Sequence, residues 1–126
     1  MVESENTTKD YTHGDKIIVT PDSGVVKRIL TPGEQGDMPQ KGQDVIVNYE
    51  GRLEDGTIFD TSADKEPLKF HIGEGQVIKG WDAGIMSMMV GEKAELTIAP
   101  EYAYGIAGNP PKIGTNATLI FDVELL

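Results

Sequence analysis

The sequence contains no cysteine and is short of positive charge. Without cysteine it can form no disulfide and use no thiol in catalysis. Its 126 residues carry 21 Asp and Glu against 11 Lys and Arg, a formal net charge of −10, which argues against nucleic acid or anionic membrane as partners. No apolar run approaches the roughly 18 residues of a membrane span, and residues 1–10 do not resemble a secretory signal. We therefore expect a soluble intracellular protein, cytoplasmic with the nucleus also possible.

Familiar catalytic signatures are absent as well. Gly75 and Gly80 have the spacing of the first two glycines of a P-loop, but Trp81 stands where that motif requires lysine. His13 and His71 are isolated from each other and have no cysteine beside them, so we predict no metal site and no cofactor. There is also no Gly-x-Ser-x-Gly nucleophile elbow.

One helical pattern, in residues 73–91, organises the rest of the chain and contains the only tryptophan. Apolar residues recur there at the spacing of one helix face: Trp81, Ile85, Met88 and Met89. Asp82 falls in the first turn, where the helix dipole favours an anion, and Gly91 suits the far end as the helix stop. A helix of about two to three turns is unstable alone, so a sheet must cover its apolar face.

The segments on either side of this helix supply that sheet. Apolar and polar residues alternate, or strand-forming residues stand between turn signals, in residues 25–31, 44–53, 57–60, 68–72, 94–98 and 117–125. Residues 1–15 are polar, acidic and without period, so we predict a disordered tail followed by one domain, residues 16–126. The expected fold class is α+β, with a mostly antiparallel sheet of about five strands wrapped on one short helix.

Most aromatic residues gather on the inferred inner faces, on the helix, or in the long loop 100–116. They are Tyr49, Phe59, Phe70, Trp81, Tyr102, Tyr104 and Phe121. Each alone is more often a core residue than a site residue, and Phe70 and Met88 are assigned to the core. Because Asp60 follows Phe59 directly and the long loop holds two tyrosines, the pattern favours a pocket with a few polar groups on apolar walls.

Five blocks carry a family resemblance between about Gly24 and Leu126. They are residues 47–53 (VNYEGRL), 56–62 (GTIFDTS), 75–82 (GQVIKGWD), 100–105 (PEYAYG) and 117–126 (ATLIFDVELL). In this order they resemble the FK506-binding-protein type of peptidyl-prolyl cis-trans isomerase, with most likeness to the first domain of larger immunophilins. The resemblance implies an antiparallel sheet curled around a short helix, with the ligand held between them.

The resemblance also implies roles for residues at matched positions. Trp81 would form the floor under a proline ring, and the apolar walls would be Tyr49, Phe59, Val77, Ile78 and Phe121. Asp60 would supply a carboxylate acceptor, while the Ile78 amide and the Tyr104 hydroxyl would donate to ligand carbonyls. Ile113 would line the loop side, and Leu68 and Gln76 complete the implied binding set. Catalysis would rest on Asp60, Tyr104, Ile78, Trp81 and Phe121.

The sequence departs from the commonest family pattern at four positions. Leu68 stands where phenylalanine often occurs, Gln76 replaces a frequent glutamate, and Asn109 replaces a frequent histidine. The loop after Asp60 is one residue short, which leaves Lys65 where an arginine often pairs with the aspartate. A lysine cannot make the forked contact that arginine makes.

The function implied is prolyl isomerisation in proline-containing proteins and peptides, with binding of FK506- or rapamycin-type macrolides. The alternative is a proline-peptide binding module with little turnover, or the lead domain of a multidomain chaperone-associated immunophilin, which the N-terminal extension and the loop 108–113 resemble. A chaperone partner would require tetratricopeptide repeats outside this chain. We expect a monomer, because inner faces take up most apolar residues.

Overall fold

The structure, a computed structural model, describes residues 14–34, 38–63 and 65–126. Its elements in order are β2 (Lys16–Ile18), β3 (Val25–Thr31), β4 (Asp44–Leu53), β5 (Ile58–Thr61), β6 (Leu68–His71), α1 (Lys79–Met86), β7 (Lys93–Ile98), the 3-10 turn η1 (Pro100–Tyr102) and β8 (Leu119–Leu125). The predicted tail lies outside the described residues except for Gly14 and Asp15, whose backbones hydrogen-bond with that of Ile29. Neither helix in these ranges is long and apolar enough to cross a bilayer.

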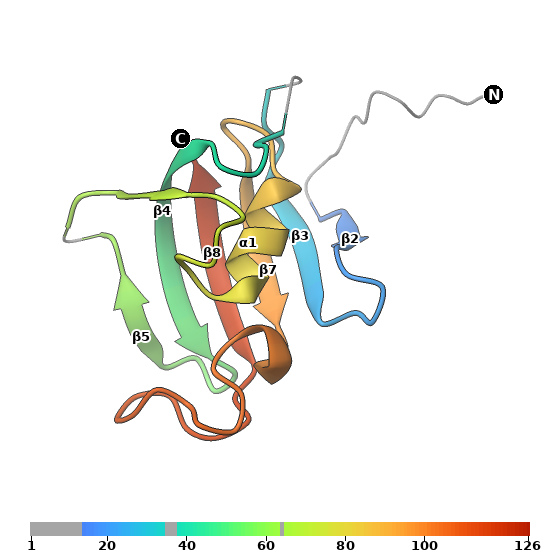
Figure 1. Cartoon of the computed structure of the whole chain (residues 1–126). Helices are drawn as coiled ribbons and strands as arrows, with labels where there is room; N and C mark the ends of the chain where they lie inside the picture. Colours follow the sequence, from blue (N-terminus) through green and yellow to red (C-terminus); the bar gives the residue numbers. More distant parts are fainter. Residues whose placement is uncertain (1–13, 35–37, 64) are drawn as a thin grey trace.

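The strands form one antiparallel sheet in the order β2-β3-β7-β8-β4-β5, and β6 also pairs with β4 (Figure 1). The predicted antiparallel sheet on one short helix is confirmed, but the described sheet has seven strands where about five were expected. The strand absent from the prediction is β2, which looked like a short apolar patch. Its three residues become a strand because they pair with residues 26–28 of β3.

Helix α1 lies across the middle of the sheet, in front of β8 and β7 in Figure 1. It is shorter than its apolar pattern suggested and ends at Met86, with Ser87 as the C-cap. The backbone N–H and the hydroxyl of Ser87 both donate to the Gly84 carbonyl, which closes the last turn. Met88 and Met89 are buried beyond the helix.

Gly91 is therefore not the helix stop. Its backbone has a positive φ of 86°, and its amide donates to the Leu125 carbonyl at 2.7 Å, in the turn that leads into β7. The positive φ explains why glycine occupies this position, since side chains strain that conformation.

The helix can approach the sheet closely because small residues face β7. A Cβ atom on Gly80 would lie 2.5 Å from the Ile98 side chain, and one on Gly84 would lie 2.8 Å from the Leu96 side chain. Both distances are shorter than a van der Waals contact allows. The buried helix face thus combines two glycines, which pack on β7, with Trp81, whose ring contacts that of Tyr49 on β4.

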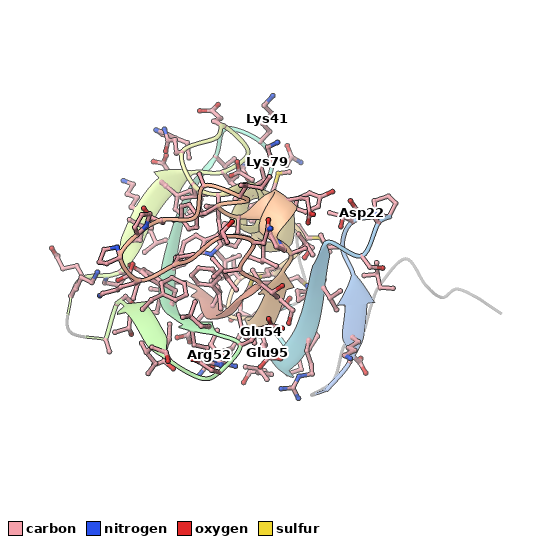
Figure 2. The ribbon with its side chains drawn as sticks, turned by 90° about the horizontal axis from the view of Figure 1, so that it is seen from below. Asp22, Lys41, Arg52, Glu54, Lys79 and Glu95 are labelled. Atoms are coloured by element: carbon pink, nitrogen blue, oxygen red, sulfur yellow. The ribbon has the colours of Figure 1, made fainter. Side chains whose placement is uncertain are left out.

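The two faces of the sheet have different chemistry. The helix covers the inner face, and the outer face carries a charged network. Arg52 lies 2.7 Å from Glu95 and 3.2 Å from Asp122, and Arg28 lies 3.3 Å from Glu95. Figure 2 shows Arg52 and Glu95 together on the side of the sheet opposite Lys79, the first residue of α1. The buried apolar side chains that pack with α1 lie on the inner face.

Candidate active site

A cavity of about 200 Å³ lies where α1 and the segments around it meet the inner face of the sheet. Its lining residues are Tyr49, Phe59, Asp60, Leu68, Gln76, Val77, Ile78, Trp81, Tyr104 and Phe121. The structure thus brings together every residue of the predicted site except Ile113. Ile113 is 4% exposed and lines a second cavity, which shares Phe59, Asp60 and Tyr104 with the first.

Another hollow in the described structure is larger, at about 580 Å³. Its lining is mostly polar and charged, and includes Asn48, Glu50 and Asp122. The smaller cavity is the better candidate because aromatic walls with a few polar groups are typical of ligand sites.

The floor of the cavity is the ring of Trp81, which is 4% exposed. The ring centroid lies 5.1 Å from that of Tyr49, 5.2 Å from that of Phe121 and 5.9 Å from that of Phe70. Its Nε1 atom has no hydrogen-bond partner among the described residues. The edge-to-face packing with Tyr49 and Phe121 fixes the indole while leaving an apolar surface for a ligand.

Gly51, in the middle of β4, allows two aromatic walls to meet. A Cβ atom there would lie 2.6 Å from the Phe121 ring and 2.7 Å from the Phe59 ring, whose centroids are 5.5 Å apart. Gly51 is opposite Phe121 on β8 and opposite Asp60 on β5. Gly51 is not among the site residues predicted from the sequence. The available signal was a glycine inside an alternating strand, which often marks a close approach.

Asp60 is fixed by two side chains. The Tyr49 hydroxyl donates to Oδ2 at 2.9 Å, and Lys65 Nζ donates to Oδ1 at 2.9 Å. Asp60 therefore also has a structural role, as the acceptor of the hydrogen bond from Tyr49. Lys65 reaches the carboxylate although the loop is short, but it contacts one oxygen where an arginine would contact both.

The same contacts set the protonation states of this trio. Burial raises the pKa of Asp60, but hydrogen bonds from Lys65 and Tyr49 outweigh it and leave the pKa below the ordinary carboxyl value. Burial and the Asp60 carboxylate raise the pKa of Tyr49, and Asp60 also raises the pKa of Lys65. Near neutral pH the group is therefore a carboxylate, a neutral phenol and an ammonium.

Two side chains hold the loop before the helix, Asp82 of α1 and Gln76 of the loop itself. Asp82 accepts hydrogen bonds from the amides of Gly73 at 2.8 Å and Gly75 at 3.0 Å, and Gln76 Oε1 accepts from the His71 amide at 2.8 Å. The carboxylate predicted for the first helical turn thus anchors this loop. The result is a fixed position for Val77 and Ile78 at the cavity wall.

The hydrogen-bond donors at the cavity without an acceptor among the described residues include, besides Trp81 Nε1, the Ile78 N–H and the Tyr104 hydroxyl. Ile78 is the N-cap of α1, so its carbonyl accepts from the Trp81 and Asp82 amides, while its own N–H makes no such bond. The Tyr104 hydroxyl, on the long loop, likewise has no partner in the described ranges. Unpaired donors beside an apolar floor suit a ligand with an apolar ring flanked by carbonyl groups.

Comparison with known proteins gives a consistent family. The sequence model of the FKBP-type peptidyl-prolyl cis-trans isomerases matches residues 36–126. FK506-binding protein 1A of Aspergillus fumigatus is 55% identical over 104 residues, which cover 82% of this chain and 93% of that protein. FK506-binding protein 59 of Drosophila melanogaster is 49% identical over 114 residues, which cover 90% of this chain and 26% of that protein. Human peptidyl-prolyl cis-trans isomerase FKBP4 is 53% identical over 105 residues, 82% of this chain and 23% of that protein.

A solved structure shows the same fold. The crystal structure of the three FKBP domains of wheat FKBP73 superposes with a TM-score of 0.80 at 37% sequence identity, over 85% of this chain and 47% of that chain. The chain therefore spans nearly the full length of some relatives and about a quarter to a half of others. By its sequence, its fold and the family match over residues 36–126, this chain belongs to the FKBP-type peptidyl-prolyl cis-trans isomerases.

Proposed function

We propose that the cavity over Trp81 is the place where the chain isomerises X-Pro bonds of client proteins, and that the same cavity binds FK506- and rapamycin-type macrolides. The observation that carries the proposal is the combination of an aromatic floor with two donors, the Ile78 amide and the Tyr104 hydroxyl, that have no acceptor among the residues the structure describes. A proline ring fits the floor, and the carbonyls on either side of it fit the donors.

The reaction requires little of the protein beyond such a cavity, because no covalent bond forms or breaks. The barrier of about 18–20 kcal/mol is the loss of amide resonance as the C–N bond twists. Uncatalysed X-Pro isomerisation takes roughly tens to hundreds of seconds. Shortening this to milliseconds needs about 10⁴-fold acceleration, or roughly 5–6 kcal/mol.

Removing water from the amide supplies part of that energy. A planar amide is more polar than a twisted one, so an apolar cavity raises the ground state relative to the transition state. The rings of Trp81, Phe59 and Phe121 form the apolar surface. The Ile78 amide and the Tyr104 hydroxyl hold the carbonyls while the bond rotates, which is positioning and not acid–base chemistry. Asp60, held by Tyr49 and Lys65, offers a fixed acceptor beside them.

The decisive experiment is a protease-coupled assay with proline peptides, run with and without FK506 or rapamycin. Trp81 is the only tryptophan, so its fluorescence reports occupancy of the cavity independently of turnover. We expect turnover that the macrolide inhibits at the concentration that changes the fluorescence. Turnover without any change of the fluorescence would place catalysis elsewhere.

The second candidate is a binding module, or the lead domain of a larger immunophilin. It is favoured by the relatives of which this chain covers only about a quarter, such as Drosophila FK506-binding protein 59. Macrolide binding without turnover in the same assay would support it. A chaperone partner would again require repeats that these 126 residues do not contain.

We also propose a monomer in the cytoplasm, with the nucleus as a second location. The burial of most apolar side chains against the helix and sheet supports the monomer. Sedimentation velocity over a hundredfold concentration range tests the monomer, and imaging of the tagged full-length protein tests the location. A concentration-dependent dimer would contradict the first proposal, and a secreted or membrane-bound signal the second.

A further inference from the structure

A second cavity, of about 300 Å³, adjoins the one over Trp81. Phe59, Asp60 and Tyr104 line both. The remaining lining residues come from the long loop: Asn109, Pro110, Pro111, Lys112 and Ile113. Because the two cavities share a wall, a client peptide whose proline occupies the first cavity places a neighbouring residue in or beside the second cavity.

Lys112, the lysine in this cavity, is positioned by a hydrogen bond of its side chain and by backbone hydrogen bonds of the next residue. Its Nζ atom donates to the Phe59 carbonyl at 3.2 Å, which ties the loop to β5. The next residue, Ile113, is buried and exchanges backbone hydrogen bonds with Asn109 at 2.9 and 3.2 Å. The exposed side chain of Lys112 thus places its ammonium beside Phe59, a residue that lines both cavities.

The charge of this ammonium is not neutralised by the described residues. Asp60, the carboxylate that lines both cavities, is paired with Lys65 at 2.9 Å. No carboxylate among the described residues forms an ion pair with Lys112. A lysine ammonium has three N–H donors, and the Phe59 carbonyl takes one of them, so the others can bind an anion.

We propose that Lys112 makes this second cavity a subsite for an acidic side chain of the client, next to the proline. The inference rests on the proposed function of the first cavity. A client carboxylate at this point meets an ammonium that forms no ion pair with any described carboxylate, in a chain whose net charge of −10 otherwise repels acidic peptides. Lys112 is thus a specificity-determining residue that does not touch the rotating bond.

The test compares peptides that differ only in the residue directly before or directly after proline, with Glu, Gln or Lys at that position. We expect kcat/KM for Glu to exceed that for Gln by about twofold to fivefold at one of the two positions, the range of an exposed ion pair. The difference should lie mainly in KM, because the contact is present in ground and transition states alike. It should disappear near 1 M salt, where the screening length falls to about 3 Å.

Two variants make the test specific. Lys112→Gln should abolish the preference for Glu, and Lys112→Glu should reverse it in favour of the Lys peptide, with each preference measured relative to the Gln peptide in the same variant. Lys16→Gln is the matched control, because it removes the same charge from β2, at the opposite end of the sheet order from β5. The control should keep the preference.

Equal rates for Glu and Gln at both positions in the wild type overturn the subsite. A preference that survives in Lys112→Gln also overturns it. Failure of the proposed function looks different, because then no peptide in the series is turned over, including the Gln peptide, and the subsite falls with it.

Discussion

A buried ion pair behind the helix gives the sharpest stability prediction. Lys27 on β3 and Glu92 before β7 are each 1% exposed, and Nζ lies 2.8 Å from Oε2. Lys27 Nζ also donates to the Ser87 carbonyl at 2.7 Å, and Glu92 Oε1 accepts from the Met89 amide at 3.1 Å. Burial lowers the pKa of Lys27, and Glu92 opposes that shift.

We expect Lys27→Met to lower the free energy of unfolding by about 3–5 kcal/mol, the cost of leaving one charge of a buried pair without its partner. Part of this loss should come from the helix. The Ser87 carbonyl lies at the helix C-terminus and loses its hydrogen bond from a cation there. The double variant Lys27→Met, Glu92→Gln should recover most of this loss, because no unpaired charge is then buried and only the Ser87 carbonyl still lacks its donor. Its glutamine keeps an oxygen for the Met89 amide.

Equilibrium unfolding in guanidinium chloride, with m-values checked for constancy, measures these differences. Lys16→Met, an exposed substitution on β2, is the control and should stay within about 0.5 kcal/mol of the wild type. If Lys27→Met costs less than about 1 kcal/mol, the pair behaves as an exposed one and the reasoning from burial is wrong. A double variant no more stable than Lys27→Met would refute the idea that the unpaired carboxylate causes the loss.

Four further predictions concern the site. Gly51→Ala should lower the free energy of unfolding by about 1–3 kcal/mol and weaken macrolide binding, because the added methyl group overlaps the Phe59 and Phe121 rings. The control is Gly114→Ala, whose methyl group meets no atom within 4 Å. It should change neither quantity in the same unfolding and titration measurements. Asp60→Leu should lower kcat/KM by about tenfold or more, since it removes a charged hydrogen-bond acceptor; full activity in the coupled assay would leave Asp60 a structural role only. The pKa of Asp60 is lowered, so its carboxylate stays ionised and kcat/KM should be flat between about pH 6 and 8, where a bell-shaped profile would reveal an acid–base step. The stability that Asp60 contributes is present above its unfolded pKa of about 3.9 and is lost as the pH falls through its lower folded value, so Asp60→Asn should reduce the acid sensitivity of unfolding.

Local pattern was enough to predict much of this protein. Alternation of apolar and polar residues predicted the strands that flank the helix, because the side chains of a strand point alternately to the two faces of its sheet. The spacing from Trp81 to Ile85 predicted a helix for the same kind of reason. The ordered motifs then indicated the residues that line the cavity, and the structure brings all of them but Ile113 to one place.

What only the tertiary structure decided involves residues far apart in the sequence. Strand β2 exists because residues 26–28 are there to pair with it, and the helix stops at Met86 because Ser87 bonds back to Gly84 while Lys27 reaches the Ser87 carbonyl from β3. The second cavity likewise needs Lys112 to meet the Phe59 carbonyl across the fold. Sequence periodicity reports which face of its own element a side chain occupies. It carries no information about the distant atoms that meet that face, and in this protein those atoms determine the helix end, the buried charges and the shape of the site.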